Sequence, residues 1–255
     1  MRVVVLSSGS KGNTTFIECG NTKILIDAGN SCKYIIDKLK GIGIEPKDID
    51  AILITHTHID HIKGLKVFLN KYNTKVYFSN KMKEELEYVN NYIITTEGNL
   101  IIKDLNINII KTSHDTNESF GYIIEYKEKS IVYITDTGYI NNKYFNLLSN
   151  KNIYIMESNH DIEMLNNSTY PFKLRKRILG DKGHLSNYDS SRYLSNFIGN
   201  NTKCIMLAHL SKDNNTPEIA YNTLIERLND NNQVIDKVII LKQDVCSEEV
   251  LIWLK

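Results

Sequence analysis

A short apolar strand that leads directly into a row of potential metal ligands is the feature that most constrains this chain. The strand is expected at 51–55 (AILIT), and His56, His58, Asp60 and His61 follow it within six residues. Alternate positions on an extended loop project to the same side, so His56 and His58 are expected to meet one cation. Asp60 and His61 stand at the start of the next helix and would turn toward a neighbouring cation. The spacing therefore predicts two cations side by side at the end of a buried strand.

Three further candidate ligands each stand where another expected strand ends. His114 follows IIKTS, Asp136 follows IVYIT and His209 follows CIMLA. A histidine at the end of one strand is more often a structural side chain than a ligand, but three such positions in order after a histidine-rich loop favour a shared site. The candidate metal ligands are His56, His58, Asp60, His61, His114, Asp136 and His209.

Apolar runs of strand length alternate with stretches of helical period along the whole chain, with only three prolines and no low-complexity linker. This alternation predicts one α/β domain over residues 1–255, in which two blocks of sheet pack face to face with helices outside. Strands are expected at 2–7, 14–19, 23–27, 51–55, 75–78, 105–112, 120–126, 130–135, 152–157, 204–208 and 237–242, and helices near 31–39, 60–72 and 80–88.

The charge balance and hydropathy exclude several classes of protein. The 255 residues carry 31 basic residues against 30 acidic ones, so no global field attracts nucleic acid or a membrane, and an anionic partner must be held by a local patch. No run approaches the roughly 20 apolar residues that a membrane crossing needs, so membrane insertion and secretion are not expected. The cysteines at 19, 32, 204 and 246 are too widely spaced for a zinc knuckle or a disulfide framework. We expect a reducing, cytoplasmic location.

Five motifs of this sequence resemble those of the metallo-β-lactamase superfamily. They are Asp27 in LIDAG, the loop from His56 to His61, His114, Asp136 and His209, and together they span nearly the whole chain. The resemblance implies a four-layer αβ/βα sandwich with metals in a cleft along the sheet edges. It also implies that Asp27 orients the histidine loop through hydrogen bonds instead of binding metal.

The same resemblance assigns the ligands to two metal ions. His56, His58 and His114 would hold the first ion, Asp60, His61 and His209 the second, and Asp136 would bridge both. An aspartate rather than a cysteine at the bridging position argues against the antibiotic-hydrolysing members. Hard carboxylate oxygens favour zinc or manganese with a hydroxide between the ions. Ester or phosphoester cleavage is the expected chemistry, with Asp60 as a ligand and a candidate general base.

Two later segments resemble those of the phosphodiesterase branch typified by RNase Z. Glu157 begins one segment after a strand, and Gly183, His184, Leu185 and Ser186 precede a helix. In that branch the histidine of the second segment faces the scissile phosphate. By this resemblance His184 would donate a proton to the leaving oxygen or stabilise the phosphoryl oxygens, with Glu157 holding it. Whether Glu157 and His160 serve catalysis or structure stays open on the sequence.

Two longer stretches resemble the YycJ branch, also called VicX or WalJ, whose members are regarded as metal-dependent DNA nucleases. They are the loop from Ser7 to Asn13 and the segment YPFKLRKRILGDKGHLSN. The glycine-rich loop offers N–H groups, hydroxyls and the charge of Lys11 to an anion, and the basic run from Lys173 to Arg177 would hold a phosphate backbone. The candidate substrate contacts are Ser8, Ser10, Lys11, Asn13, Arg175, Lys176, Arg177 and Ser186.

A dinuclear-metal phosphodiesterase, and specifically a DNA exonuclease, is the leading hypothesis. Only 22 positions separate His114 from Asp136 and 73 separate Asp136 from His209, which leaves no room for the arm of tRNA-processing relatives or the extra domain of β-CASP nucleases. The alternatives are a small-molecule ester or thioester hydrolase of the glyoxalase II or lactonase type, an RNA-directed nuclease, and a nucleic-acid-binding protein that has lost its metals.

Overall fold

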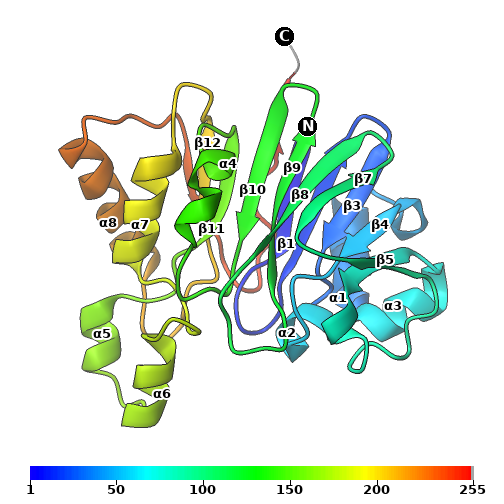
Figure 1. Ribbon diagram of the computed structural model, residues 1–255, viewed down its shortest axis with the longest axis horizontal. Helices are drawn as coiled ribbons and strands as arrows, with labels where there is room; N and C mark the ends of the chain where they lie inside the picture. Colours follow the sequence, from blue (N-terminus) through cyan, green and yellow to red (C-terminus); the bar gives the residue numbers. More distant parts are fainter. Residues whose placement is uncertain (254–255) are drawn as a thin grey trace.

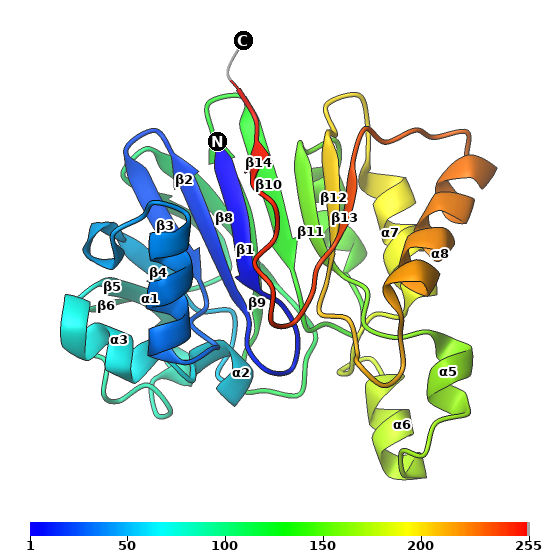
Figure 2. The same cartoon turned by 180° about the vertical axis from the view of Figure 1, so that it is seen from behind.

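The computed structural model describes residues 1–253 and places two seven-stranded sheets face to face, with helices on both outer faces (Figures 1 and 2). α1 and α3 cover the outer face of the first sheet, and α7 and α8 cover that of the second. The layers therefore run helix, sheet, sheet, helix, and the expected αβ/βα sandwich is confirmed.

The first sheet has the strand order β14-β1-β2-β3-β4-β5-β6. β1, β2 and β3 form an antiparallel meander, and β3 to β6 are parallel. The strands are β1 (Arg2–Ser7), β2 (Thr14–Cys19), β3 (Thr22–Ile26), β4 (Ala51–Leu53), β5 (Lys75–Ser79), β6 (Tyr92–Thr95) and β14 (Val250–Leu251). The helical elements of this half are α1 (Cys32–Gly41), α2 (Ile59–Ile62), α3 (Leu65–Tyr72) and the 3₁₀ turns η1 (Pro46–Asp48) and η2 (Asn80–Met82).

The second sheet has the order β13-β12-β11-β10-β9-β8-β7, and β10 to β13 are parallel. The strands are β7 (Gly98–Ile102), β8 (Leu105–Lys111), β9 (Phe120–Tyr126), β10 (Lys129–Ile134), β11 (Ile153–Glu157), β12 (Cys204–Ala208) and β13 (Val238–Ile240). The helical elements are η3 (Asn142–Tyr144), α4 (Phe145–Leu148), α5 (Ile162–Asn166), α6 (Phe172–Ile178), α7 (Asn187–Phe197) and α8 (Pro217–Asp230).

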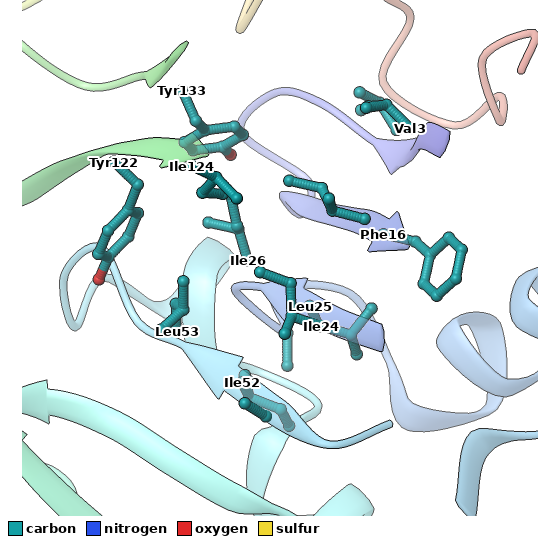
Figure 3. Packing of buried hydrophobic residues seen from close by; sticks show 14 of the residues in the cluster. Val3, Phe16, Ile24, Leu25, Ile26, Ile52, Leu53, Tyr122, Ile124 and Tyr133 are labelled. Atoms are coloured by element: carbon teal, nitrogen blue, oxygen red, sulfur yellow. The ribbon is translucent and has the colours of Figure 1, made fainter. Parts of the chain in front are cut away.

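Alternation along the strands divides the apolar residues between two cores. On β10, Ile131 and Tyr133 point into the core between the sheets, and Val132 and Ile134 point toward the helices. Figure 3 shows Tyr133 and its neighbours from the second sheet packed against side chains of the first sheet. Both faces of β10 are buried, which explains its continuous apolar sequence.

Two cross-sheet hydrogen bonds fix the strand that leads into the histidine loop. The Tyr122 hydroxyl of β9 donates to the Ile54 carbonyl over 2.6 Å, and the Phe120 N–H donates to the Thr55 carbonyl over 2.9 Å. Burial raises the pKa of Tyr122 well above its usual value, so its hydroxyl stays a donor. These bonds fix the position of His56 relative to the second sheet, because the two residues before it are hydrogen-bonded to β9.

The parallel strands explain why the candidate ligands come together. Residues that follow parallel strands share one edge of a sheet, and this edge is where open α/β sheets bind ligands. β3 and β4 bring Asp27 and His56 to that edge in the first sheet, and β10, β11 and β12 bring three more segments to it in the second. α2 marks this end of the molecule in both views (Figures 1 and 2).

Two expected helices differ from the observed elements. The stretch 60–72 is two helices, α2 and α3, that are separated at Gly64. A Cβ at Gly64 would lie 2.2 Å from the Asn30 carbonyl oxygen, and the Gly64 N–H donates to the Ala28 carbonyl, so the chain turns there against the loop after β3.

The prediction of a helix at 80–88 is wrong, because only η2 forms there and the following residues make turns. Met82, Leu86 and Val89 are buried and hold this segment against the sheet while it returns to β6. The edge strands β6 and β7, and the two-residue β14, were not expected. Exposed isoleucines on β6 and β7 interrupt the burial pattern that would reveal a strand. Among the helices formed by residues 1–253, none combines the length and apolar character that a bilayer crossing requires.

Candidate metal centre

Three histidines from two parts of the chain form the first cluster of donor atoms. His56 and His58 lie between β4 and α2, and His114 follows β8. Their donor nitrogens lie within 4.8 Å of one another, and His58 Nδ1 is 3.2 Å from His114 Nε2. The structure therefore brings together the three residues that were expected to hold the first cation.

A second cluster of Asp60, His61 and His209 lies beside the first, with donor atoms again within 4.8 Å of one another. Asp60 Oδ2 is 3.7 Å from His61 Nε2 and 3.8 Å from His209 Nε2. Asp136 lies between the clusters, since its Oδ2 is 3.1 Å from His61 Nε2 and its Oδ1 is 3.9 Å from His114 Nε2. This position is the one a bridging carboxylate would need.

The donor atoms themselves fit a pair of divalent cations. His56 Nε2 and His209 Nε2 are buried, and neither has a hydrogen-bond partner among residues 1–253. Leaving such groups unpaired costs about 1–3 kcal/mol each, so their convergence calls for a ligand. Burial and neighbouring histidines hold the pKa of His56 well below its usual value, so the ring is neutral as a metal ligand must be. Imidazole and carboxylate donors suit zinc and manganese.

Asp27 lies behind the second cluster and holds it in place. Asp27 is fully buried and its Oδ2 is 2.7 Å from His61 Nδ1. Its carboxylate also accepts hydrogen bonds from the N–H and hydroxyl of Thr55, each over 2.8 Å. Burial alone would lower the pKa of His61, but the negative charges of Asp27 and Asp136 raise it to about 10, so a cation bound at Nε2 would have to replace a proton. These contacts confirm that Asp27 orients the histidine loop through hydrogen bonds.

Glu157 holds two histidines of the site at once. Its Oε1 is 2.7 Å from His184 Nδ1 and 3.0 Å from His209 Nδ1. Its Oε2 accepts the N–H groups of Thr137 and Leu185. Burial would raise the pKa of Glu157, but the charge and hydrogen bond of His184 lower it to about 2, so it is a carboxylate. His184 lies in the site as expected, with its Nδ1 3.6 Å from Asp136 Oδ1.

Backbone conformation turns three of these side chains toward the clusters. Asp27, Asp136 and His209 follow β3, β10 and β12, and their φ angles are 60°, 54° and 56°. Non-glycine residues rarely adopt this left-handed region, and such strain, on the order of 1–3 kcal/mol each, gathers at functional sites. The sequence carries no signal that would have predicted these angles.

Three candidate substrate contacts are buried and hydrogen-bonded to other groups of the protein. The buried Ser8 hydroxyl accepts the His209 N–H over 2.8 Å. Asn13 is buried, with its Nδ2 2.9 Å from His61 Nε2 and 3.3 Å from Asp60 Oδ2. Ser186 is the N-cap of α7 and accepts the Asp189 N–H. Each of the three side chains is buried and bonded to protein groups, and their contact with substrate stays a prediction.

Four of the other candidate contacts, Ser10, Lys11, Lys176 and Arg177, are exposed, and Arg175 is partly buried. Ser10 and Lys11 are exposed, and Lys11 Nζ lies 2.9 Å from an Asp244 carboxylate oxygen. Arg177 pairs with Asp115, whose Oδ1 is 3.4 Å from His114 Nε2, so the end of α6 lies at the first cluster. Arg175 donates to the Asn166 carbonyl, whereas the side chain of Lys176 is exposed. α5 and α6 project beyond the sheets at the same end as α2 (Figures 1 and 2).

Two further residues, Asp115 and His160, lie close to the candidate ligands or to the residues that hold them. Asp115 was not expected, although it adjoins a candidate ligand, and contact with Arg177 lowers its pKa against the opposing effect of burial. His160 is buried, and neither ring nitrogen has a hydrogen-bond partner within residues 1–253. Its backbone carbonyl accepts the Asn187 N–H, which joins the segment after β11 to the start of α7.

Comparison with known proteins gives both a family and relatives. A family model described as a β-lactamase superfamily domain matches residues 22–196. The protein named exodeoxyribonuclease WalJ of Streptococcus pneumoniae serotype 2 is 38% identical over 233 residues, which cover 88% of this chain and 87% of the relative. The protein named exodeoxyribonuclease YycJ of Bacillus anthracis is 36% identical over 223 residues, covering 85% of this chain and 84% of the relative.

Solved structures with the same fold are more distant in sequence. The metallo-β-lactamase fold protein YhfI from Bacillus subtilis has a TM-score of 0.76 at 17% identity, with 98% of this chain and 99% of that chain covered. The short form of human tRNase Z has a TM-score of 0.67 at 15% identity, with 97% and 99% covered. At these identities the likeness concerns the fold alone.

Proposed function

The chain belongs to the β-lactamase superfamily, and from that membership we propose that it is a metal-dependent phosphodiesterase that acts on DNA as an exonuclease. The relatives that cover most of the chain are named exodeoxyribonucleases. His184 carries the proposal at the level of structure, because it is held by Glu157 directly beside the two donor clusters.

We propose that the donor clusters hold two divalent cations, zinc or manganese. His56, His58 and His114 would hold one, Asp60, His61 and His209 the other, and Asp136 would contact both. Cations bound there would lower the pKa of a water and neutralise charge on a phosphoryl group. The orphaned nitrogens of His56 and His209 support this assignment, since a cation would satisfy them.

His184 is the proposed proton donor to the leaving oxygen. The Glu157 carboxylate engages Nδ1, which leaves Nε2 for the substrate. Burial would lower the pKa of His184, but the carboxylates of Glu157 and Asp136 raise it, which favours a protonated ring. A positioned acid of this kind contributes about 10²–10⁴-fold to a rate.

The DNA backbone is proposed to reach the cations past α6 and the loop after β1. Lys173 and Lys176 are exposed on α6, and Ser10 and Lys11 are exposed on the loop. Arg177 fixes this helix at the first cluster through Asp115. Phosphate contacts of this kind hold a strand without reading its sequence.

We further propose a cytoplasmic site of action, where bacterial DNA is found. All four cysteines are free, and three of them are buried, which agrees with a reducing compartment.

The test is a comparison of substrates by the purified, metal-loaded protein. End-labelled single-stranded and double-stranded DNA, RNA of the same sequence, and a thioester would be incubated with zinc or manganese. The proposal expects stepwise release of mononucleotides from DNA and faster cleavage of DNA than of RNA. Thioester turnover without any nucleolysis would contradict it and favour the glyoxalase-like alternative.

A further inference from the structure

A hollow of about 350 Å³ lies between the loop after β12, the loop after β13 and the loop after β1. We name it the Lys242 pocket. Its apolar wall consists of the buried residues Leu210 and Leu241 and of Val245, which is half exposed. Lys11, Lys212 and Lys242 line the same hollow and are exposed, and so is Asp244, so the net charge of its mouth is positive. The pocket thus joins an apolar wall to a group of positive charges.

The Lys242 pocket is connected to the proposed metal centre. Leu210 directly follows His209, and the Ser8 hydroxyl on the loop after β1 accepts the His209 N–H. A second hollow, of about 390 Å³, is lined by Asp60 on the metal side. Lys11 and Asp244 line both hollows, so their ion pair lies between them. The two hollows thus lie on either side of this ion pair, with Asp60 in the wall of one and Leu210 in the wall of the other.

Contacts between the loops give the pocket a defined wall. A Cβ at Gly9 would lie 2.5 Å from Gln243 Cγ, so Gln243 packs directly on the glycine loop. The Gln243 amide also donates to the Leu210 carbonyl over 3.4 Å. Figures 1 and 2 show the loop after β1 and the loop after β13 at the same end of the sheets as α2.

We propose that the Lys242 pocket binds one nucleotide unit of the DNA strand, next to the nucleotide whose phosphate is cleaved. The base would lie against the apolar wall, and its phosphate would be held by Lys212 and Lys242. The volume is at the lower end of the range for small-ligand sites, roughly 300–1,000 Å³, and lysines are common phosphate ligands. This inference rests on the proposed function and adds a subsite to it.

Lys11 can exchange its partner Asp244 for a phosphate of the substrate. Its ion pair with Asp244 has both side chains more than half exposed, at 57% and 56%. Such pairs contribute little in water, typically about 0–1 kcal/mol. A phosphate entering the pocket therefore replaces Asp244 as the partner of Lys11 at little cost, and Asp244 acts as a competitor for the substrate.

Calorimetric titration with thymidine 5′-monophosphate tests the subsite on the metal-loaded protein. The Lys212→Glu/Lys242→Glu variant reverses the charge of the mouth, and Val245→Trp fills the hollow at an exposed position. Each is expected to weaken binding by about tenfold and to raise the KM for DNA. Asp244→Asn is expected to strengthen binding by about threefold, because it frees Lys11. Thymidine and inorganic phosphate, each lacking half of the contacts, should bind more weakly than the nucleotide.

Lys47→Glu is the matched control. Lys47 is an exposed lysine on η1, which precedes β4 and so lies at the opposite end of that strand from His56. Its variant should bind the nucleotide as the wild type does. Equal affinity and equal KM for DNA in wild type, Val245→Trp and the double variant would overturn the subsite, while DNA cleavage by the wild type would still uphold the proposed function. Failure of the wild type to cleave DNA would instead count against the function itself.

Discussion

Single buried carboxylates decide which way the imidazoles of this site face. Glu157 engages Nδ1 of both His184 and His209, and Asp27 engages Nδ1 of His61. The other nitrogen of His184 and of His209 is then left for a substrate or a cation, and His61 Nε2 is turned toward Asn13 and Asp136 in the second cluster. The paired positions lie 27 to 52 residues apart in the chain. The roles of Asp27 and of Glu157 beside His184 were therefore expected only from the family resemblance, and the pairing of Glu157 with His209 was not expected.

His184→Ala tests the proton donor. We expect kcat for DNA cleavage to fall by about 100-fold or more. Bound metal should be unchanged, because His184 is not a proposed ligand of either ion, although its donor atom lies within 4.8 Å of those of Asp136 and His209. Steady-state kinetics and metal analysis on the same samples measure both. Glu157→Gln is the companion variant, because it keeps the shape of the side chain and weakens its hold on His184. Unchanged rates in His184→Ala would return this residue to a structural role.

His160 is expected to make the fold sensitive to acid. Burial lowers its pKa from 6.5 to about 4. The unfolded chain therefore takes up the proton first as pH falls, so the stability from the neutral ring is complete above pH 6.5 and is lost as pH falls toward 4. The loss is on the order of 3 kcal/mol.

Urea unfolding at pH 7.5 and pH 5 measures this effect, with His160→Leu as the comparison. Leucine has no ionisable group, so the variant should lose less free energy of unfolding between the two pH values than the wild type. An equal loss in both proteins would show that His160 is not the group that titrates.

At the scale of elements, the strands that supply ligands could be predicted from the sequence, whereas three of the four edge strands, β6, β7 and β14, could not. β4, β10 and β12 are buried on both faces, so their apolar runs stand out and end at the candidate ligands. β6 is half exposed at a sheet edge and gave no such signal. Four candidate ligands were found because they lie within six residues of one another, and the other three because each follows a buried apolar run. The hydrogen bonds of Ser8 and Asn13 were not predicted, because they join distant segments.

The basic helix α6 carries its own prediction. The combined change of Arg175, Lys176 and Arg177 to Ala should weaken DNA binding and flatten its salt dependence, because fewer counterions are released. Most of the direct effect on DNA is expected from Lys176, since Arg175 and Arg177 are bonded to Asn166 and Asp115. Fluorescence anisotropy with labelled DNA over a series of salt concentrations measures the slope. An unaltered slope would remove α6 from the DNA path.

At the scale of the whole molecule, the site depends on both sheets. The core between the sheets contains residues from each, such as Phe16 and Tyr133, so neither sheet can bury its inner face alone. The cross-sheet bond from Tyr122 to Ile54 also sets the entry to the histidine loop. The candidate metal ligands that follow strands of the first sheet and those that follow strands of the second therefore come together only when both sheets are folded and packed.

We propose that residues 1–255 unfold as one unit. Far-ultraviolet circular dichroism and tyrosine fluorescence should report the same urea midpoint for the metal-free protein. Two separate transitions would contradict a single domain and indicate that the two sheets fold independently.

Anomalous diffraction from crystals grown without chelator tests the central claim most directly. The account predicts two cation peaks, one among His56, His58 and His114 and one among Asp60, His61 and His209, with Asp136 in contact with both. In Asp60→Asn the second peak should weaken or vanish and DNA cleavage should be lost, while the fold is retained. Full activity in a protein that shows no peak at either cluster, or cations bound elsewhere, would contradict the account.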